Sequence, residues 1–152
     1  MMRVIAIGRQ RAGAEAELFE RYAGRIRPRL ELVELPEARG GAAEVKRREN
    51  EALLAALPAR ALAVALDPGG AALDSAELAA RLDGWLALAR PICFLIGGAE
   101  GLNATTLARA DASLCLGRMT WPHLLARAML AEQLYRAQSI RTGHPYHRDG
   151  RP

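Results

Sequence analysis

The chain has 152 residues, of which 51% are hydrophobic and 25% charged, which is typical of a single domain (1–152) whose core needs no disulfide or metal. Each of its two cysteines lies in an apolar run, which favours buried thiols over a bridge or a metal site. No signal peptide is visible, and no apolar stretch approaches the ~20 residues that span a bilayer, so we expect a cytoplasmic protein without a membrane partner.

The net charge of +4 is unevenly distributed along the chain. Residues 1–117 carry 15 basic and 15 acidic side chains, whereas residues 118–152 carry 6 arginines, 2 acids and all three histidines. A basic end of this kind favours a polyanionic partner, with nucleic acid as the leading candidate. The alternative is a solvated arm without a partner.

The first half of the chain alternates apolar runs with segments of helical period. Residues 4–7 predict a strand, and residues 15–27 predict a helix with one apolar face. Residues 30–35 predict a second strand, and residues 43–57 predict a second helix. Proline and glycine in residues 36–41 indicate a loop between these two elements.

The alternation continues in the middle of the chain. Residues 61–66 predict a third strand, and the glycines and proline of residues 67–72 indicate a loop. A third helix is expected after Asp74, because Asp74 and Glu77 have the spacing of a capping box. Residues 92–96 predict a fourth strand.

The last third of the chain completes the pattern. Asn103 is placed to cap a short helix over residues 104–110, and residues 113–116 predict a fifth strand. A long final helix is expected from Pro122 to about Ile140, followed by an irregular C-terminal tail, residues 141–152. Such β-α alternation predicts an α/β fold with a mostly parallel sheet flanked by helices.

Distinctive loops follow the third, fourth and fifth predicted strands, at residues 66–70, 96–102 and 116–123. Ligands of open parallel sheets bind beyond the carboxyl ends of the strands, so these loops are the candidate ligand site. A plain tight turn is the alternative for each. The glycines at 97, 98 and 101 match neither a dinucleotide fingerprint nor a P-loop, and residues 8–13 are a poor match to the former, which disfavours a nucleotide-dependent oxidoreductase.

Other catalytic arrangements are weaker. The sequence contains no nucleophile elbow, and neither cysteine lies in a cationic setting. His144 and His147 flank Pro145 and Tyr146, but no further ligands complete a metal site. We therefore expect neither nucleophilic catalysis nor a metal.

Four motifs occur in order: IGGAEGL at 96–102, MTWPHL at 119–124, AEQLYRA at 131–137 and HPYHR at 144–148. In these the chain resembles the ribosomal RNA large subunit methyltransferase H family, SPOUT-class enzymes that methylate N3 of a pseudouridine in 23S ribosomal RNA. The resemblance covers nearly the whole chain. It implies a SPOUT-type fold with a C-terminal trefoil knot, S-adenosylmethionine as cofactor, and the helix 69 region of 23S rRNA on the assembled ribosome as substrate. It also implies a homodimer in which the tail of one subunit completes the partner's active site.

The same resemblance implies the site residues. Eight residues would hold the cofactor: Leu66, Gly98, Gly117, Arg118, Met119, Thr120, Trp121 and Pro122. Gly117, Arg118 and Trp121 occupy variable positions of the family's cofactor loop, which is expected to bind largely through its backbone. The residues after Arg148 extend beyond the family's usual end.

The tail would meet the target nucleotide. Tyr146, His147 and Arg148 are the expected catalytic residues, with Arg148 binding phosphate or stabilising the ring anion and His147 as a base. Glu100 is the alternative base, or else a carboxylate that favours the dipole of the following helix. His123 is expected to anchor its loop or to touch RNA.

Four further residues are expected to bind the RNA substrate: His144, Arg127, Arg136 and Arg141. An ordinary solvated arginine is the alternative for each of the three arginines. A second alternative for Arg136 is an i,i+4 pair with Glu132. For the protein as a whole, the alternative function is an RNA-binding module without catalysis, which would need no cofactor loops.

Overall fold

The structure is a computed structural model that describes residues 1–150. Five strands form one sheet in the order β2-β1-β4-β3-β5, and every neighbouring pair is parallel. The strands are β1 (Met2–Ile7), β2 (Leu30–Leu35), β3 (Leu62–Ala71), β4 (Ile92–Ile96) and β5 (Ala112–Leu114). The helices are α1 (Ala14–Ala23), α2 (Ala42–Ala55), α3 (Ser75–Ala87), α4 (Ala104–Arg109) and α5 (His123–Thr142). The predicted α/β class with a parallel sheet is confirmed.

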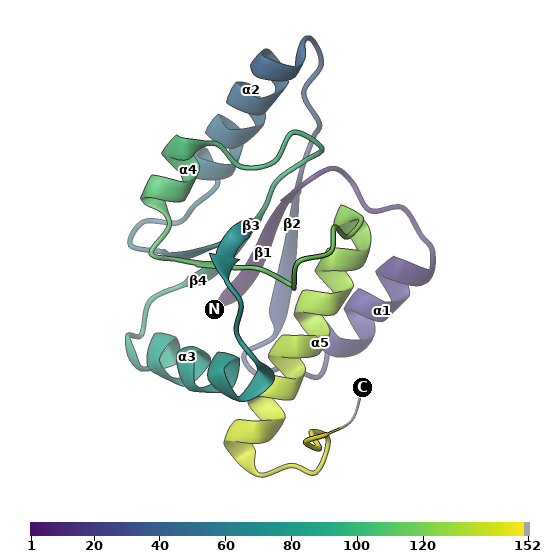
Figure 1. Cartoon of the computed structure of the whole chain (residues 1–152), viewed down its shortest axis with the longest axis vertical. Coiled ribbons are helices and arrows are strands. Elements are labelled where there is room, and N and C mark those ends of the chain that lie inside the picture. Colours follow the sequence, from purple (N-terminus) through teal and green to yellow (C-terminus); the bar gives the residue numbers. More distant parts are fainter. Residues whose placement is uncertain (151–152) are drawn as a thin grey trace.

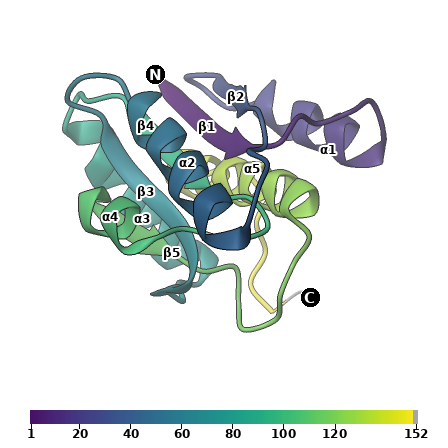
Figure 2. The same ribbon diagram turned by 90° about the horizontal axis from the view of Figure 1, so that it is seen from above.

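Helices cover both faces of the sheet (Figures 1 and 2). On one face α5 lies between α1 and α3, and on the other α2 and α4 lie side by side. Along β4, Phe94 packs into the core of the first face, whereas Cys93 and Leu95 pack into the core of the second. Burial on both faces explains why the strands read as continuous apolar runs rather than as alternating patterns.

Two predicted helix starts are confirmed. At α3 the Glu77 amide donates to Asp74 Oδ1 at 2.8 Å, and the Asp74 amide donates to Glu77 Oε2 at 2.7 Å, which completes the capping box. At α4 the Thr106 amide donates to Asn103 Oδ1 at 2.9 Å. These caps fix the residues at which α3 and α4 begin after β3 and β4.

The third strand is longer than the sequence predicts. Leu66 and Ala71 both register with Leu114 of β5, so residues 67–70 bulge outward between two pairings instead of forming a free loop. At Gly70 a Cβ would lie 2.6 Å from the Leu114 backbone, so only glycine lets the returning chain approach β5 this closely. Strand β5 is correspondingly short and ends at Leu114.

The ends of two helices also differ from the prediction. Helix α1 stops at Ala23, because the Arg25 and Ile26 amides bond to carbonyls three residues back, which tightens the chain into a turn. Helix α5 starts at His123, with Pro122 at its N-cap, and runs on to Thr142. The irregular part of the tail therefore begins at Gly143, and residues 151–152 of the predicted tail lie outside the described residues.

Candidate active site

A cavity of ≈ 460 Å³ lies beside the bulge of β3 and the carboxyl ends of β4 and β5, where the three segments singled out by the sequence meet. All eight residues predicted to hold the cofactor line it: Leu66, Gly98, Gly117, Arg118, Met119, Thr120, Trp121 and Pro122. Its size falls in the range of small-molecule sites. We call it the cofactor cavity below.

At Gly98, the side of the loop that faces away from the cofactor cavity is closely packed. A Cβ on Gly98 would lie 2.6 Å from Glu49 Oε1 and 3.1 Å from Ile7 Cγ2. Glu49 is buried on α2, where its other oxygen accepts from the Ala38 amide at 3.2 Å. The glycine thus leaves its backbone open to the cavity while the strand behind it stays packed.

Asn50, also buried on α2, holds the C-terminal end of the loop that follows β4. Its Nδ2 donates to the Gly101 carbonyl at 3.1 Å, and its Oδ1 accepts from the Asn103 amide at 3.0 Å. These bonds fix the loop before any ligand binds. Glu49 and Asn50 were not predicted as site residues, although Glu49 falls four residues after Val45 and four before Leu53, on the predicted apolar face of that helix.

The loop after β5 carries exposed apolar side chains. The Trp121 indole donates to the Leu116 carbonyl at 3.0 Å, which closes the loop on itself. Met119 is 72% exposed and Trp121 36% exposed. Large apolar groups in such positions often mark a contact surface.

Arg127 corrects the sequence analysis, which placed it among the RNA contacts. Its side chain is fully buried, and it donates to Glu34 Oε2 at 2.9 Å and to the carbonyls of Ile7 and Gly8 at 2.7 Å each. Burial lowers the pKa of Arg127, and the Glu34 carboxylate opposes that shift. A guanidinium committed to these partners is inaccessible to RNA, so Arg127 instead ties the start of α5 to the end of β1.

Tail residues dock on α1 and α5 of their own chain. The Tyr146 ring packs edge-on against Tyr135, with centroids 4.8 Å apart, and its hydroxyl donates to Glu132 Oε1 at 2.9 Å. Tyr22 of α1 completes the cluster, with its hydroxyl 3.4 Å from that of Tyr146. Arg25 donates to the Tyr135 hydroxyl at 2.7 Å from the other side. This cluster was not predicted from the sequence, and it fixes the tail as far as Tyr146.

Arg136 forms the i,i+4 pair with Glu132 that the sequence offered as an alternative to RNA binding, through its Nε at 3.0 Å and its Nη2. Its guanidinium also lies 4.9 Å from the centre of the Tyr146 ring. An RNA contact by Arg136 stays a prediction. Of the other predicted contacts, His144 and Arg148 are exposed, and His147 is half-buried.

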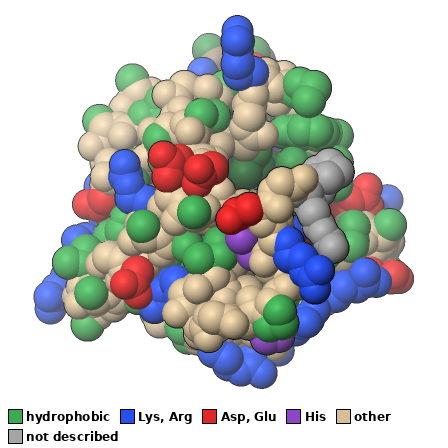
Figure 3. All heavy atoms as spheres, turned by 60° about the horizontal axis from the view of Figure 1, so that its bottom comes forward, with side chains coloured by type: hydrophobic (Ala, Val, Ile, Leu, Met, Phe, Trp, Pro, Cys, Tyr) green, Lys and Arg blue, Asp and Glu red, His purple; other side chains and the backbone are tan. Residues whose placement is uncertain are grey.

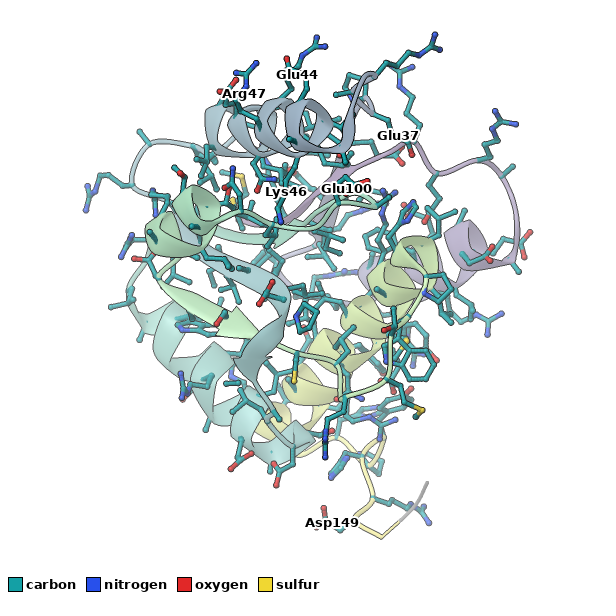
Figure 4. All side chains as sticks on the ribbon, turned by 45° about the horizontal axis from the view of Figure 1, so that its top comes forward. Glu37, Glu44, Lys46, Arg47, Glu100 and Asp149 are labelled. Atoms are coloured by element: carbon teal, nitrogen blue, oxygen red, sulfur yellow. The ribbon has the colours of Figure 1, made fainter. Side chains whose placement is uncertain are left out.

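One chain does not bring the predicted catalytic residues to the cofactor cavity. The cavity borders the start of α5, whereas the tail follows the end of this helix and folds back as far as Glu132. Nine helical residues, about 14 Å, still separate Glu132 from His123 at the cavity. Figure 4 shows Asp149 of the tail at the opposite end of the molecule from Glu100, which is exposed on the loop after β4. His123 is half-buried at the first position of α5 and lines the cavity.

The remaining chemistry-bearing groups are few. Among residues 1–150, no three His, Cys, Asp or Glu side chains gather as a metal would require. None of the helices in that range is long and apolar enough to cross a membrane. Both cysteines are free thiols, and burial raises the pKa of Cys93.

Comparison with known proteins identifies the class of this fold and site. Residues 1–147 match the family model described as "Predicted SPOUT methyltransferase", and the chain is a member of that class. Within it, the chain belongs to the ribosomal RNA large subunit methyltransferase H family.

The curated relatives support this membership along the full length. The protein of that name from Gluconacetobacter diazotrophicus is 63% identical over 151 residues and covers 99% of both chains. The Acidiphilium cryptum protein is 59% identical over 151 residues, covering 99% of this chain and 96% of its own. The Rhodospirillum rubrum protein is 53% identical over 147 residues, covering 95% and 97%.

Replacement of Gly98 by alanine tests the packing behind the cofactor cavity. We expect the affinity for S-adenosylmethionine to fall about tenfold, because the new methyl group pushes the loop away from Glu49. Isothermal titration calorimetry measures this affinity. Gly41→Ala, at a position with nothing within 4 Å, is the matched control, and Gly98→Ala/Glu49→Ala should recover part of the loss. An unchanged affinity in Gly98→Ala would contradict the packing argument.

Proposed function

We propose that this S-adenosylmethionine-dependent ribosomal RNA methyltransferase acts on N3 of a pseudouridine in the helix 69 region of 23S rRNA. We also propose that it works as a homodimer on the assembled ribosome, in the cytoplasm where ribosomes are found. The observation that carries the proposal is the convergence of three loops on one cavity in a chain of this family.

The residues of the cofactor cavity fit S-adenosylmethionine. The cavity has the volume for a small ligand, and at Gly98 the loop has no room for a side chain, so that backbone groups face the ligand. Leu66 and residues 117–122 would enclose it from the other two sides. When bound, this cofactor supplies an electrophilic methyl group on a positively charged sulfur.

A homodimer follows from the placement of the tail. The tail docks at Glu132, about 14 Å along α5 from His123 of the cofactor cavity, and the residues that line this cavity include none of the tail, so a site that uses both would take the tail of a second copy. The exposed Met119 and Trp121 beside the cavity are suited to meet such a partner. Each composite site would then combine the loops of one subunit with the tail of the other.

The trefoil knot implied by the family is part of the same proposal. Such a knot requires the chain to return from the edge strand β5 to the middle of the helical layer. Helix α5 makes this return and lies between α1 and α3 (Figure 1). Residues 97–103 and 115–122 would be the loops through which the knot is threaded.

The tail's part in the reaction follows from the acidity of the target. N3 of a pseudouridine carries a proton that must leave, and the ring then holds a negative charge. Arg148, exposed at the end of the docked tail, would pair with that charge or with the nucleotide's phosphate. Burial, and then the hydrogen bonds to Tyr22 and Glu132, raise the pKa of Tyr146, so its hydroxyl stays protonated and holds the tail rather than acting as a base.

The basic surface around the tail suits a polyanionic substrate. On the face in Figure 3, Lys and Arg side chains gather along the lower right. Arg21, Arg25 and Arg27 at the end of α1 are exposed on the same layer as the tail. Phosphate contacts of this kind position an RNA without reading its sequence.

The proposed function is tested by incubating the protein with ribosomes that lack this modification and labelled S-adenosylmethionine, then mapping the labelled nucleotide. We expect one labelled pseudouridine in helix 69, methylated at N3. Label at another nucleotide would contradict the proposed substrate. A protein that bound RNA but gave no heat with S-adenosylmethionine in calorimetry would instead be a binding module.

A further inference from the structure

The two ring nitrogens of His147 contact groups whose hydrogen-bonding roles are fixed. Nδ1 lies 3.3 Å from Nη1 of Arg136, and a guanidinium only donates. Nε2 lies 2.8 Å from Oδ1 of Asp149, and an ionised carboxylate only accepts. Both contacts therefore require the same state of the ring, which is neutral, with its proton on Nε2 and its lone pair on Nδ1.

Arg136 is held in place to impose this state. Glu132 accepts from two of its nitrogens, and the guanidinium lies over the Tyr146 ring. Glu132 also accepts from the Tyr146 hydroxyl, so one carboxylate fixes both the arginine and the tail. The bond to Glu132 raises the pKa of Arg136, which keeps it a donor at every working pH.

The Nε2–H of His147 points away from the Arg136 guanidinium and the Tyr146 ring. Its partner Asp149 has a side chain that is 97% exposed, so an incoming substrate oxygen can take its place at little cost. The carboxylate oxygen thus marks where an anionic acceptor would sit. The lone pair on Nδ1, which a general base would need, is covered by Arg136.

We propose that Arg136, fixed by Glu132, is a positioning residue that keeps His147 as the Nε2–H tautomer, so that His147 donates a hydrogen bond to the target base instead of removing its N3 proton. The identity of the acceptor rests on the proposed function. As N3–H ionises, its proton goes to water and negative charge spreads onto the carbonyl oxygens beside N3. The N3 lone pair then forms the bond to the methyl carbon, while the carbon–sulfur bond breaks and its electrons stay on sulfur. Throughout, Nε2–H would stabilise a carbonyl oxygen.

The tautomer is tested on the free homodimer by nitrogen-15 NMR with labelled histidine. His123→Asn and His144→Asn assign the signals, since the chain has three histidines. At alkaline pH we expect His147 as the Nε2–H form in the wild type and in Arg136→Lys, which preserves a donor, and a mixture of tautomers in Arg136→Met. The control is Arg141→Met, which removes another arginine of α5 that pairs with Asp83 of α3, and it should change nothing. An Nδ1–H form in the wild type, or no change in Arg136→Met, would overturn the proposal.

Activity of His147 variants gives the second readout. A glutamine amide places an N–H near the position of Nε2 but cannot act as a base, whereas asparagine reaches only toward Nδ1. We expect His147→Gln to keep kcat within about fivefold of the wild type with the same pH profile, and His147→Asn and His147→Ala to lose about 100-fold. Glutamine as inactive as alanine would overturn the donor role. If the wild type itself methylated no RNA while the NMR result held, the proposed function would fail and the role of Arg136 would stand.

Discussion

The Arg148→Ala variant is expected to methylate ribosomal RNA at least ~100-fold more slowly than the wild type, with unchanged stability and unchanged affinity for S-adenosylmethionine. Arg148 is exposed beyond the Tyr146 anchor, so its removal should leave the fold intact. In the proposed mechanism, the variant lacks the cation that would pair with the developing ring anion. Single-turnover rates on ribosomes lacking the modification measure the effect.

Two further variants separate the charge of Arg148 from its shape. Arg148→Lys should recover part of the rate, because a lysine retains the charge but not the planar fork of donors. Arg47→Ala, which removes an exposed arginine that pairs with Glu44 and Glu51 on α2, is the matched control and should stay near the wild-type rate. A rate near the wild type in Arg148→Ala would refute the proposed role.

The second large effect concerns stability. Arg127→Met is expected to lower the free energy of unfolding by about 3 kcal/mol, because it strands the Glu34 carboxylate and the carbonyls of Ile7 and Gly8. Urea unfolding at one protein concentration measures the loss, since the proposed dimer would make stability depend on concentration.

Arg3→Met is the control for the loss of stability expected in Arg127→Met. It breaks an Arg–Glu pair of the same 2.9 Å length between β1 and β2, but both side chains are partly exposed, so we expect a loss below about 1 kcal/mol. Equal losses in Arg3→Met and Arg127→Met would contradict the role of Arg127 as a buried clamp. Arg127→Met/Glu34→Leu should recover part of the loss, because it removes the stranded carboxylate.

Local signals in the sequence were sufficient for most of the fold. The caps at Asp74 and Asn103 depend on residues three positions apart, so they are visible without tertiary structure. Strand β4 could be placed because a strand that is buried on both faces is a continuous run of apolar residues. The return of residues 67–71 to β5 could not, because it depends on the backbone of Leu114, more than forty residues away.

Part of the candidate site could likewise be predicted from the sequence, and part could not. The three cofactor loops follow from the rule that ligands bind at the carboxyl ends of parallel strands, and their residues do line one cavity. Arg127 was misplaced because its charge suggested an RNA contact, although it lies within the apolar sequence of residues 124–131. These apolar neighbours were the sequence signal that Arg127 lies on a buried helix face. Glu132 and Arg136 lie on α5, whereas His147 lies in the tail. The i,i+4 spacing in the sequence predicts the Glu132–Arg136 pair but not the contact of Arg136 with His147.

The central claim is that each active site combines the cofactor loops of one subunit with the tail of the other, and purified heterodimers test it most directly. Arg148→Ala and Gly98→Leu, a bulkier change than alanine, should each abolish activity in a homodimer. A heterodimer of these two variants keeps one intact composite site, so we predict about half of the wild-type rate. A heterodimer of the wild type with the double variant should be inactive. The reverse pattern, an inactive first heterodimer and a half-active second one, would show that each site lies within a single chain and would contradict the account.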